Sequence, residues 1–167
     1  LAPLVAGASI YCMPENPKEF SVENVRVTKI LGGSLSDSEV IHGMCVLRTS
    51  ETSIHKVKDA KVAVFNNPLE AESGDTKGTV LLKTAEELQN YTKGEEEMME
   101  KFVKKLSDAG VNVVISGGSI SEICLHYMEK YNMMVLRIHS KFETKRIAAS
   151  LGGATLVRLD APTPEEL

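Results

Sequence analysis

The strongest constraint on the fold is a strand-like segment that runs through a glycine loop into a helix. Residues 111–115 (VNVVI) have the β-branched, apolar character of a buried strand. Residues 116–119 (SGGS) form a short loop, and apolar residues recur at helical spacing over residues 119–131. This order places backbone amides and one helix face at a rim, where either an anion or a polypeptide could bind.

The rest of the chain predicts an α/β fold around this unit. Helices are expected at residues 84–109, 119–131 and 141–151, and strands at residues 111–115, 133–138 and 155–159. Such alternation favours a sheet with right-handed crossovers. Three further β-branched runs, residues 25–31, 40–47 and 61–65, predict a second sheet packed against the first.

The first half of the helix at residues 84–109 lacks a core face. The second half has one, formed by Met98, Met99, Phe102, Val103 and Leu106, and Gly110 is placed to end the helix. Between residues 86 and 97 the only large apolar residues are Leu88 and Tyr91, and the preceding residues 69–78 are polar. We therefore expect residues 69–97 to protrude, which suits an assembly contact better than a small enzyme.

The loop at residues 116–119 admits three interpretations. A phosphate site fits its position before a helix, but the loop lacks the GxGxxG and GxxxxGK[ST] patterns. A tight turn that needs glycines with positive φ explains the loop as well as the two binding interpretations together, and the phosphate site is the least favoured of the three. A peptide-contact loop is the third interpretation, and the similar-looking residues 74–79 (GDTKGT) are better read as a hairpin turn.

A helical wheel of residues 119–131 separates an apolar arc from a polar one. The apolar arc, expected to face the core, carries Ile120, Ile123, Cys124, Tyr127, Met128 and Tyr131. The opposite arc carries Ser121, Glu122, Leu125, His126 and Glu129. A leucine beside a glycine loop on a polar helix face favours a contact surface.

Composition excludes several classes of function. The net charge of −4 gives no electrostatic reason to expect nucleic acid, and no apolar run reaches the roughly 18 residues of a membrane span. The three cysteines and four histidines lack metal-ligand spacing, so reduced thiols in an intracellular protein are expected. Both ends resemble interrupted helices, which predicts a domain cut from a longer chain.

Five separated segments resemble the group II chaperonins, and among them the eukaryotic cytosolic chaperonin TRiC/CCT. The resemblance covers nearly the whole chain without large insertions. The segments are residues 37–46 (DSEVIHGMCV), 61–70 (KVAVFNNPLE), 76–96 (TKGTVLLKTAEELQNYTKGEE), 110–138 (GVNVVISGGSISEICLHYMEKYNMMVLRI) and 146–159 (RIAASLGGATLVRL).

The resemblance implies an apical, substrate-binding domain with a β-sandwich core flanked by helices and a helical lid protrusion. Residues 32–160 would form this domain, with the protrusion at about residues 69–97. Residues 1–31 and 161–167 would belong to an intermediate domain. The implied lid residues are Thr76, Lys77, Leu88, Tyr91, Glu95 and Glu96. The implied substrate-binding residues are Ser116, Gly117, Gly118, Ser119, Ser121, Glu122, Leu125, His126 and Glu129.

The resemblance also implies the partners and the limits of this chain. Expected partners are non-native polypeptides such as actin and tubulin, and other subunits of a double hetero-oligomeric ring in the cytoplasm. ATP and Mg²⁺ would bind the parent subunit outside these residues, so the chain itself would be neither an enzyme nor a cofactor protein. From the residues alone, a small α/β enzyme that binds phosphate at residues 116–119 remains the alternative.

Overall fold

The computed structural model describes residues 1–70 and 85–163, with the backbone alone for residues 85–92. The chain divides into two compact units, Leu1–Leu47 and Arg48–Leu167. The second unit contains the predicted helix–strand alternation and the whole hydrophobic core.

The second unit is built on a four-stranded parallel sheet. Its strands are β1 (Val62–Phe65), β2 (Val113–Ser116), β3 (Met134–Arg137) and β4 (Thr155–Leu156). The order is β3-β2-β1-β4, so the chain steps outward from β1 to β3 and then returns to the other side of β1. The predicted α/β class is confirmed, although β4 is shorter than the predicted residues 155–159.

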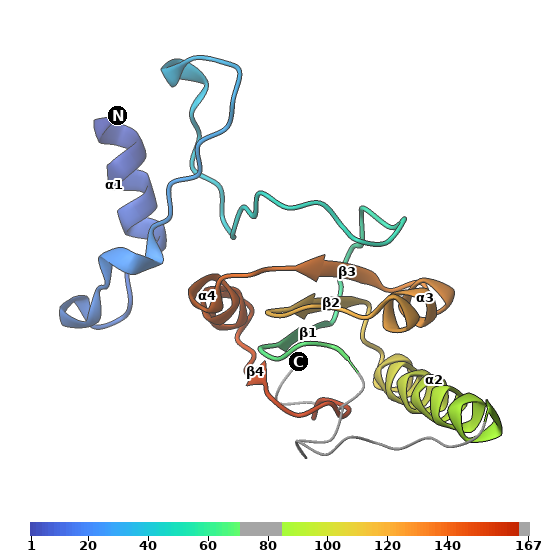
Figure 1. Cartoon of the computed structure of the whole chain (residues 1–167). Helices are drawn as coiled ribbons and strands as arrows, with labels where there is room; N and C mark the ends of the chain where they lie inside the picture. The colour runs from blue at the N-terminus through green and yellow to red at the C-terminus, as the bar shows by residue number, and fades with distance from the viewer. Residues whose placement is uncertain (71–84, 164–167) are drawn as a thin grey trace. The chain divides into compact units, whose positions relative to one another are not determined.

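Three helices connect these strands and cover both faces of the sheet. Helix α2 (Ala85–Asp108) and helix α3 (Glu122–Lys130) lie on one side, whereas helix α4 (Lys141–Leu151) lies on the other (Figure 1). The bounds of α4 match the prediction. Helix α3 begins three residues later than predicted, because Ser121 caps it by accepting a hydrogen bond from the Cys124 N–H.

The core forms where the second half of α2 meets the sheet. Met99, Phe102, Val103 and Leu106 are buried at the 3–4-residue spacing of one helix face. The ring of Phe102 meets that of Phe65 from β1 edge-to-face, with centroids 5.7 Å apart. Met98, which was predicted on this face, is exposed instead, because it lies one residue outside the buried stripe.

The first unit contains little regular structure. Helix α1 (Ala2–Tyr11) confirms the predicted helical start, and three short 3₁₀ turns follow at Pro17–Glu19, Val22–Asn24 and Leu35–Asp37. The strands predicted at residues 25–31 and 40–47 are wrong, since neither range contains a strand. The described residues accordingly hold one sheet, and the second layer of the predicted sandwich is missing from them.

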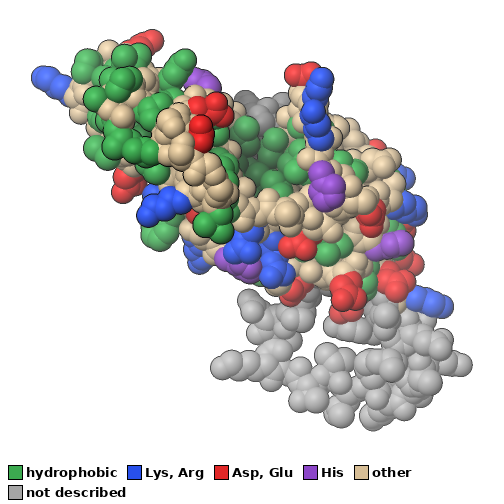
Figure 2. Space-filling model, turned by 90° about the horizontal axis from the view of Figure 1, so that it is seen from above, with side chains coloured by type: hydrophobic (Ala, Val, Ile, Leu, Met, Phe, Trp, Pro, Cys, Tyr) green, Lys and Arg blue, Asp and Glu red, His purple; other side chains and the backbone are tan. Residues whose placement is uncertain are grey.

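The failed strands share one physical cause, which is the lack of a covering layer. No residue of the first unit is buried, and Val27, Ile30, Leu31, Ile41 and Leu47 are all exposed. In Figure 2 the surface that this unit forms, at the left of the view, is largely hydrophobic. β-branched residues favour a strand only when a neighbouring strand and a packed face are present.

Candidate functional site

The loop at residues 116–119 is packed against the end of β1, and only Ser119 in it is exposed. Ser116 is fully buried, and its Oγ lies 3.3 Å from the carbonyl oxygen of Asn67 and 3.2 Å from that of Gly118. The Gly117 N–H donates to the carbonyl oxygen of Phe65 at 2.8 Å. Ser116 is therefore structural and cannot contact a partner in this conformation.

The two glycines of this loop are required by a close backbone approach. A Cβ atom on Gly118 would stand 2.7 Å from the backbone nitrogen of Pro68, and one on Gly117 would stand 3.0 Å from the carbonyl oxygen of Asn66. Neither glycine has a positive φ, so the interpretation that the turn needs that conformation is wrong. The glycines instead let two backbone segments pass in contact.

The same packing occupies several of the amides that a phosphate would need. The Gly118 N–H donates to Ser116 Oγ, and the Ser121 N–H donates to the carbonyl oxygen of Leu69. A short bridge between Leu69 and Ile120 ties the loop to the segment after β1. Only Ser119 in this loop is exposed. The geometry therefore gives no support to the phosphate-binding interpretation.

The outer face of α3 is polar, with less apolar surface than predicted. Cys124 and Met128 are fully buried, whereas Glu122, His126 and Glu129 are exposed as expected. Leu125 is half-buried and packs against the core, so its prediction as an outlying exposed leucine is wrong. Helix α3 contacts both α2 and β3, and burial consequently extends further around it than one arc of the wheel.

The outer face of α4 presents the exposed aromatic side chain that α3 lacks. Phe142 is 73% exposed, on the side of the helix opposite the buried residues Thr144, Ile147 and Ala148. Lys141 and Lys145 beside it are also exposed. This candidate contact surface was not predicted, although a helical wheel of residues 141–151 would have placed Phe142 opposite Ile147.

Hydrogen bonds at both ends fix α4 in place. At its start the Ser140 Oγ accepts from the Glu143 N–H, and the Thr144 hydroxyl donates to the Ser140 carbonyl oxygen. At its end Gly152 has a φ of 75°, and the Gly153 N–H donates to the carbonyl oxygen of Ala148. Phe142 therefore projects from a rigid support.

The predicted lid residues are only partly described. Thr76 and Lys77 lie outside the described residues, and Leu88 and Tyr91 are described only as part of the backbone of α2. Glu95 is half-buried and Glu96 is exposed. Leu69, at the predicted start of the protrusion, is fully buried in the core. A protruding segment can therefore begin only after Leu69.

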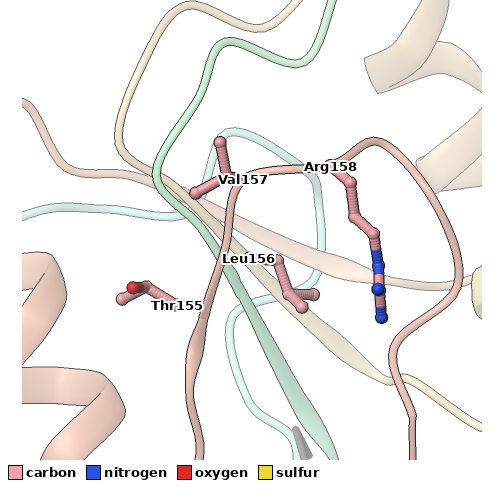
Figure 3. Close-up of a pocket in the computed structure, with 4 residues that line it drawn as sticks. All are labelled: Thr155, Leu156, Val157 and Arg158. Atoms are coloured by element: carbon pink, nitrogen blue, oxygen red, sulfur yellow. The ribbon is translucent and has the colours of Figure 1, made fainter.

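The described residues do not assemble a recognisable catalytic or metal centre. Nowhere in residues 1–70 and 85–163 do three or more His, Cys, Asp or Glu side chains gather as metal ligands. A surface depression of about 250 Å³ is lined by Thr155, Leu156, Val157 and Arg158. The side chains of Thr155 and Arg158 lie on either side of Leu156 and do not converge (Figure 3). Such a depression lacks the converging polar groups typical of a ligand pocket.

The environment of Cys124 makes its thiol unreactive. Burial raises the pKa of this thiol to about 12, so the nucleophilic thiolate is scarce at neutral pH.

Across the part of the chain that the structure describes, no helix is both long and apolar enough to cross a membrane.

Comparison with known proteins places this geometry in a family. T-complex protein 1 subunit theta of Homo sapiens is 45% identical over 167 residues, which is 100% of this chain and 30% of the relative. A probable theta subunit of Schizosaccharomyces pombe is 42% identical over the same residues. Within the resemblance to TRiC/CCT, residues 76–88 (TKGTVLLKTAEEL) and 92–96 (TKGEE) predict likeness to the theta subunit in particular, and these identities confirm that prediction. The chain spans about a third of the length of these relatives.

A solved structure agrees with the sequence comparison. The open-state monomer of a group II chaperonin from Methanococcoides burtonii matches 99% of this chain with a TM-score of 0.73 and 25% identity, over 36% of that monomer. The family model of the TCP-1/cpn60 chaperonin family matches residues 1–167. The chain therefore belongs to the TCP-1/cpn60 chaperonin family.

Proposed function

We propose that this chain is the polypeptide-binding part of an ATP-driven chaperonin subunit. Residues 32–160 would form the apical domain, and residues 1–31 and 161–167 would belong to the intermediate domain. The exposed apolar side chains of α1 support a further domain beside residues 1–31, because an apolar helix needs a covering surface, whereas the first compact unit of the structure extends to Leu47.

One observation carries the binding role: Phe142 stands exposed on a helix that is capped at both ends. An aromatic ring on a fixed support offers apolar contact area at little cost in conformational entropy. Burying it fully would contribute roughly 1.5–3 kcal/mol. Because association itself costs several kcal/mol, one such contact gives weak binding on the order of millimolar.

The outer face of α3 is the second candidate contact surface. Ser119, Glu122, His126 and Glu129 are exposed there, with Ser121 and Leu125 half-buried beside them. This face would contact polar side chains of a client, while Phe142 would contact apolar ones. Several such domains acting together in a ring would raise the overall affinity, since linked weak contacts combine as avidity.

The remaining parts of the proposal concern the parent subunit. ATP and Mg²⁺ would bind outside this chain, and nucleotide-driven rotation would close a lid formed by the segment between Leu69 and Glu97. The partners would be other subunits of a double hetero-oligomeric ring and non-native clients such as actin and tubulin, in the cytoplasm. The chain by itself would not hydrolyse ATP.

Site-specific photocrosslinking in assembled rings tests the binding role. A photoreactive residue in place of Phe142 or His126 should label an unfolded client, and ATP-driven closure should remove the label. The same residue in place of the fully buried Met128 is the control and should give no label. The binding role is wrong if neither exposed position labels any client under conditions in which the rings still fold it.

A further inference from the structure

The aromatic ring on α4 is surrounded by positive charge. Between residues 137 and 150 the chain carries Arg137, Lys141, Lys145 and Arg146, with Glu143 as the only acidic residue, whereas the whole chain has a net charge of −4. The side chains of Lys141 and Lys145 are exposed, and neither forms an ion pair with a described residue. The guanidinium of Arg137 lies 3.3 Å from Nε2 of His139.

The placement of Lys141 is unfavourable for the helix itself. Lys141 is the first residue of α4, where the helix dipole is positive and a cation is destabilising. Glu143, the residue that complements this dipole, is half-buried, so it neutralises little of the outer face. A charge that works against local stability is typical of a functional surface.

We propose that the outer face of α4 selects client segments that carry acidic side chains next to an apolar one. This inference rests on the proposed function and adds a charge preference to it. Phe142 would pack on the apolar side chain, while Lys141 and Lys145, which are i, i+4 neighbours on one flank of it, would attract the carboxylates. The dipole at the start of α4 adds to the same positive potential.

The outer face of α3 has the opposite character, which sharpens the selection. Its exposed residues include Glu122 and Glu129, which would repel the acidic segments that α4 attracts. Helices α3 and α4 lie on opposite sides of the sheet (Figure 1). A single domain would thus sort client segments by charge between its two faces, through attraction on one and repulsion on the other.

The test measures labelling of matched peptides by assembled rings with a photoreactive residue at position 142. The peptides share one unstructured sequence with a central leucine, flanked by four Glu, four Gln or four Lys residues. We expect the acidic peptide to be labelled about three- to tenfold more than the basic one at low salt, as two exposed ion pairs allow. High salt should reduce this ratio, since it screens exposed charges.

Charge reversal on α4 supplies the decisive variant. The double substitution Lys141→Glu, Lys145→Glu should invert the preference, so that the basic peptide is labelled more. Lys101→Glu, Lys104→Glu is the matched control, because it changes net charge equally on exposed positions of α2, on the opposite side of the sheet. This control should leave the preference unchanged. Far-UV circular dichroism of both variants checks that the fold is retained.

The possible outcomes separate this inference from the proposed function. Equal labelling of all three peptides at position 142 overturns the charge preference and leaves the binding role standing. Labelling at position 126 without any at position 142 also overturns the inference, because it removes α4 from the client surface. If the photoreactive residue labels neither a peptide nor an unfolded client from position 142 or from position 126, the proposed function itself fails.

Discussion

The two units of this chain use similar amino acids to very different effect. Residues 1–47 contain β-branched runs and an apolar helix but bury no side chain, whereas the described residues of the second unit bury a continuous set of apolar side chains around the sheet. The difference lies in connectivity, since β1, β2 and β3 each find a parallel neighbour within the same unit. Apolar segments of this chain therefore form strands and a core only where a second layer of structure packs against them.

Thiol reactivity should show the largest contrast between the units. Cys45 is exposed, whereas Cys124 is buried with a pKa raised to about 12. At pH 8 only roughly one Cys124 thiol in 10⁴ is ionised, so alkylation should be at least about a thousandfold slower than at Cys45. Mass spectrometry of a labelling time course measures both rates. Comparable rates would mean that the core opens readily.

The same shifted pKa predicts a loss of stability in alkali. The unfolded thiol ionises near its ordinary value of 9.0, while the folded thiol keeps its proton until about 12. Stability is therefore complete below pH 9 and falls above it, by about 1.4 kcal/mol for each pH unit. Urea unfolding at pH 8 and pH 10 should show this decline, and Cys124→Ala should abolish it.

A matched pair of leucine truncations tests the contrast in burial directly. Leu106 is fully buried on α2, so Leu106→Ala should lower the free energy of unfolding by about 2–5 kcal/mol. Leu31 is fully exposed, and Leu31→Ala should stay within about 0.5 kcal/mol. Urea denaturation followed by circular dichroism at 222 nm measures both. A large effect at Leu31 would show that residues 1–47 pack more tightly than described.

Alanine in place of glycine should act in opposite directions in the two units. Gly118→Ala would force a Cβ atom to within 3 Å of Pro68 backbone atoms, which should cost about 1–3 kcal/mol. Gly7 lies within α1 and meets only an ordinary contact with Val40, so Gly7→Ala should raise helix stability by up to about 1 kcal/mol. Thermal unfolding measures the first change and helical circular dichroism the second. Two changes of the same sign would contradict the close approach at Gly118.

Loss of a helix cap should give the smallest contrast. Ser121 accepts from the Cys124 N–H at the start of α3, so Ser121→Ala should cost about 1 kcal/mol. Ser21 accepts from the Glu23 N–H at a three-residue turn in the first unit, where Ser21→Ala should change stability by less than about 0.5 kcal/mol. The urea unfolding midpoints of the two variants measure this difference. Equal shifts of the midpoint would contradict the assignment of Ser121 as the cap of α3.

The structure of the second unit could be predicted well from the sequence, because the spacing of its apolar residues and the positions of its turn and cap residues indicate the same elements. The buried stripe from Met99 to Leu106, the positive φ of Gly110 and the bounds of α4 all follow from local patterns. Residues 25–31 failed for the opposite reason, because strand propensity says nothing about whether a partner strand is present.

The candidate site was harder to predict than the fold. A wheel treats a helix as if one face alone were covered, but α3 is covered by both α2 and β3, which draws Leu125 inward. The role of Gly118 depends on Pro68, fifty residues earlier, and no local pattern reports that approach. The exposure of Phe142 could have been predicted from the sequence, since a helical wheel places Phe142 on the side of the helix opposite Ile147.

Helix α2 extends well beyond the stretch that the structure shows packed against the sheet. Among the residues whose side chains are described, its buried stripe runs from Met99 to Leu106, while the helix itself starts at Ala85, roughly 21 Å before Met99 at 1.5 Å per residue. Over that length a rotation of about 10° about Met99 displaces the start of the helix by about 4 Å. A small tilt of the sheet is thus converted into a larger displacement at Ala85.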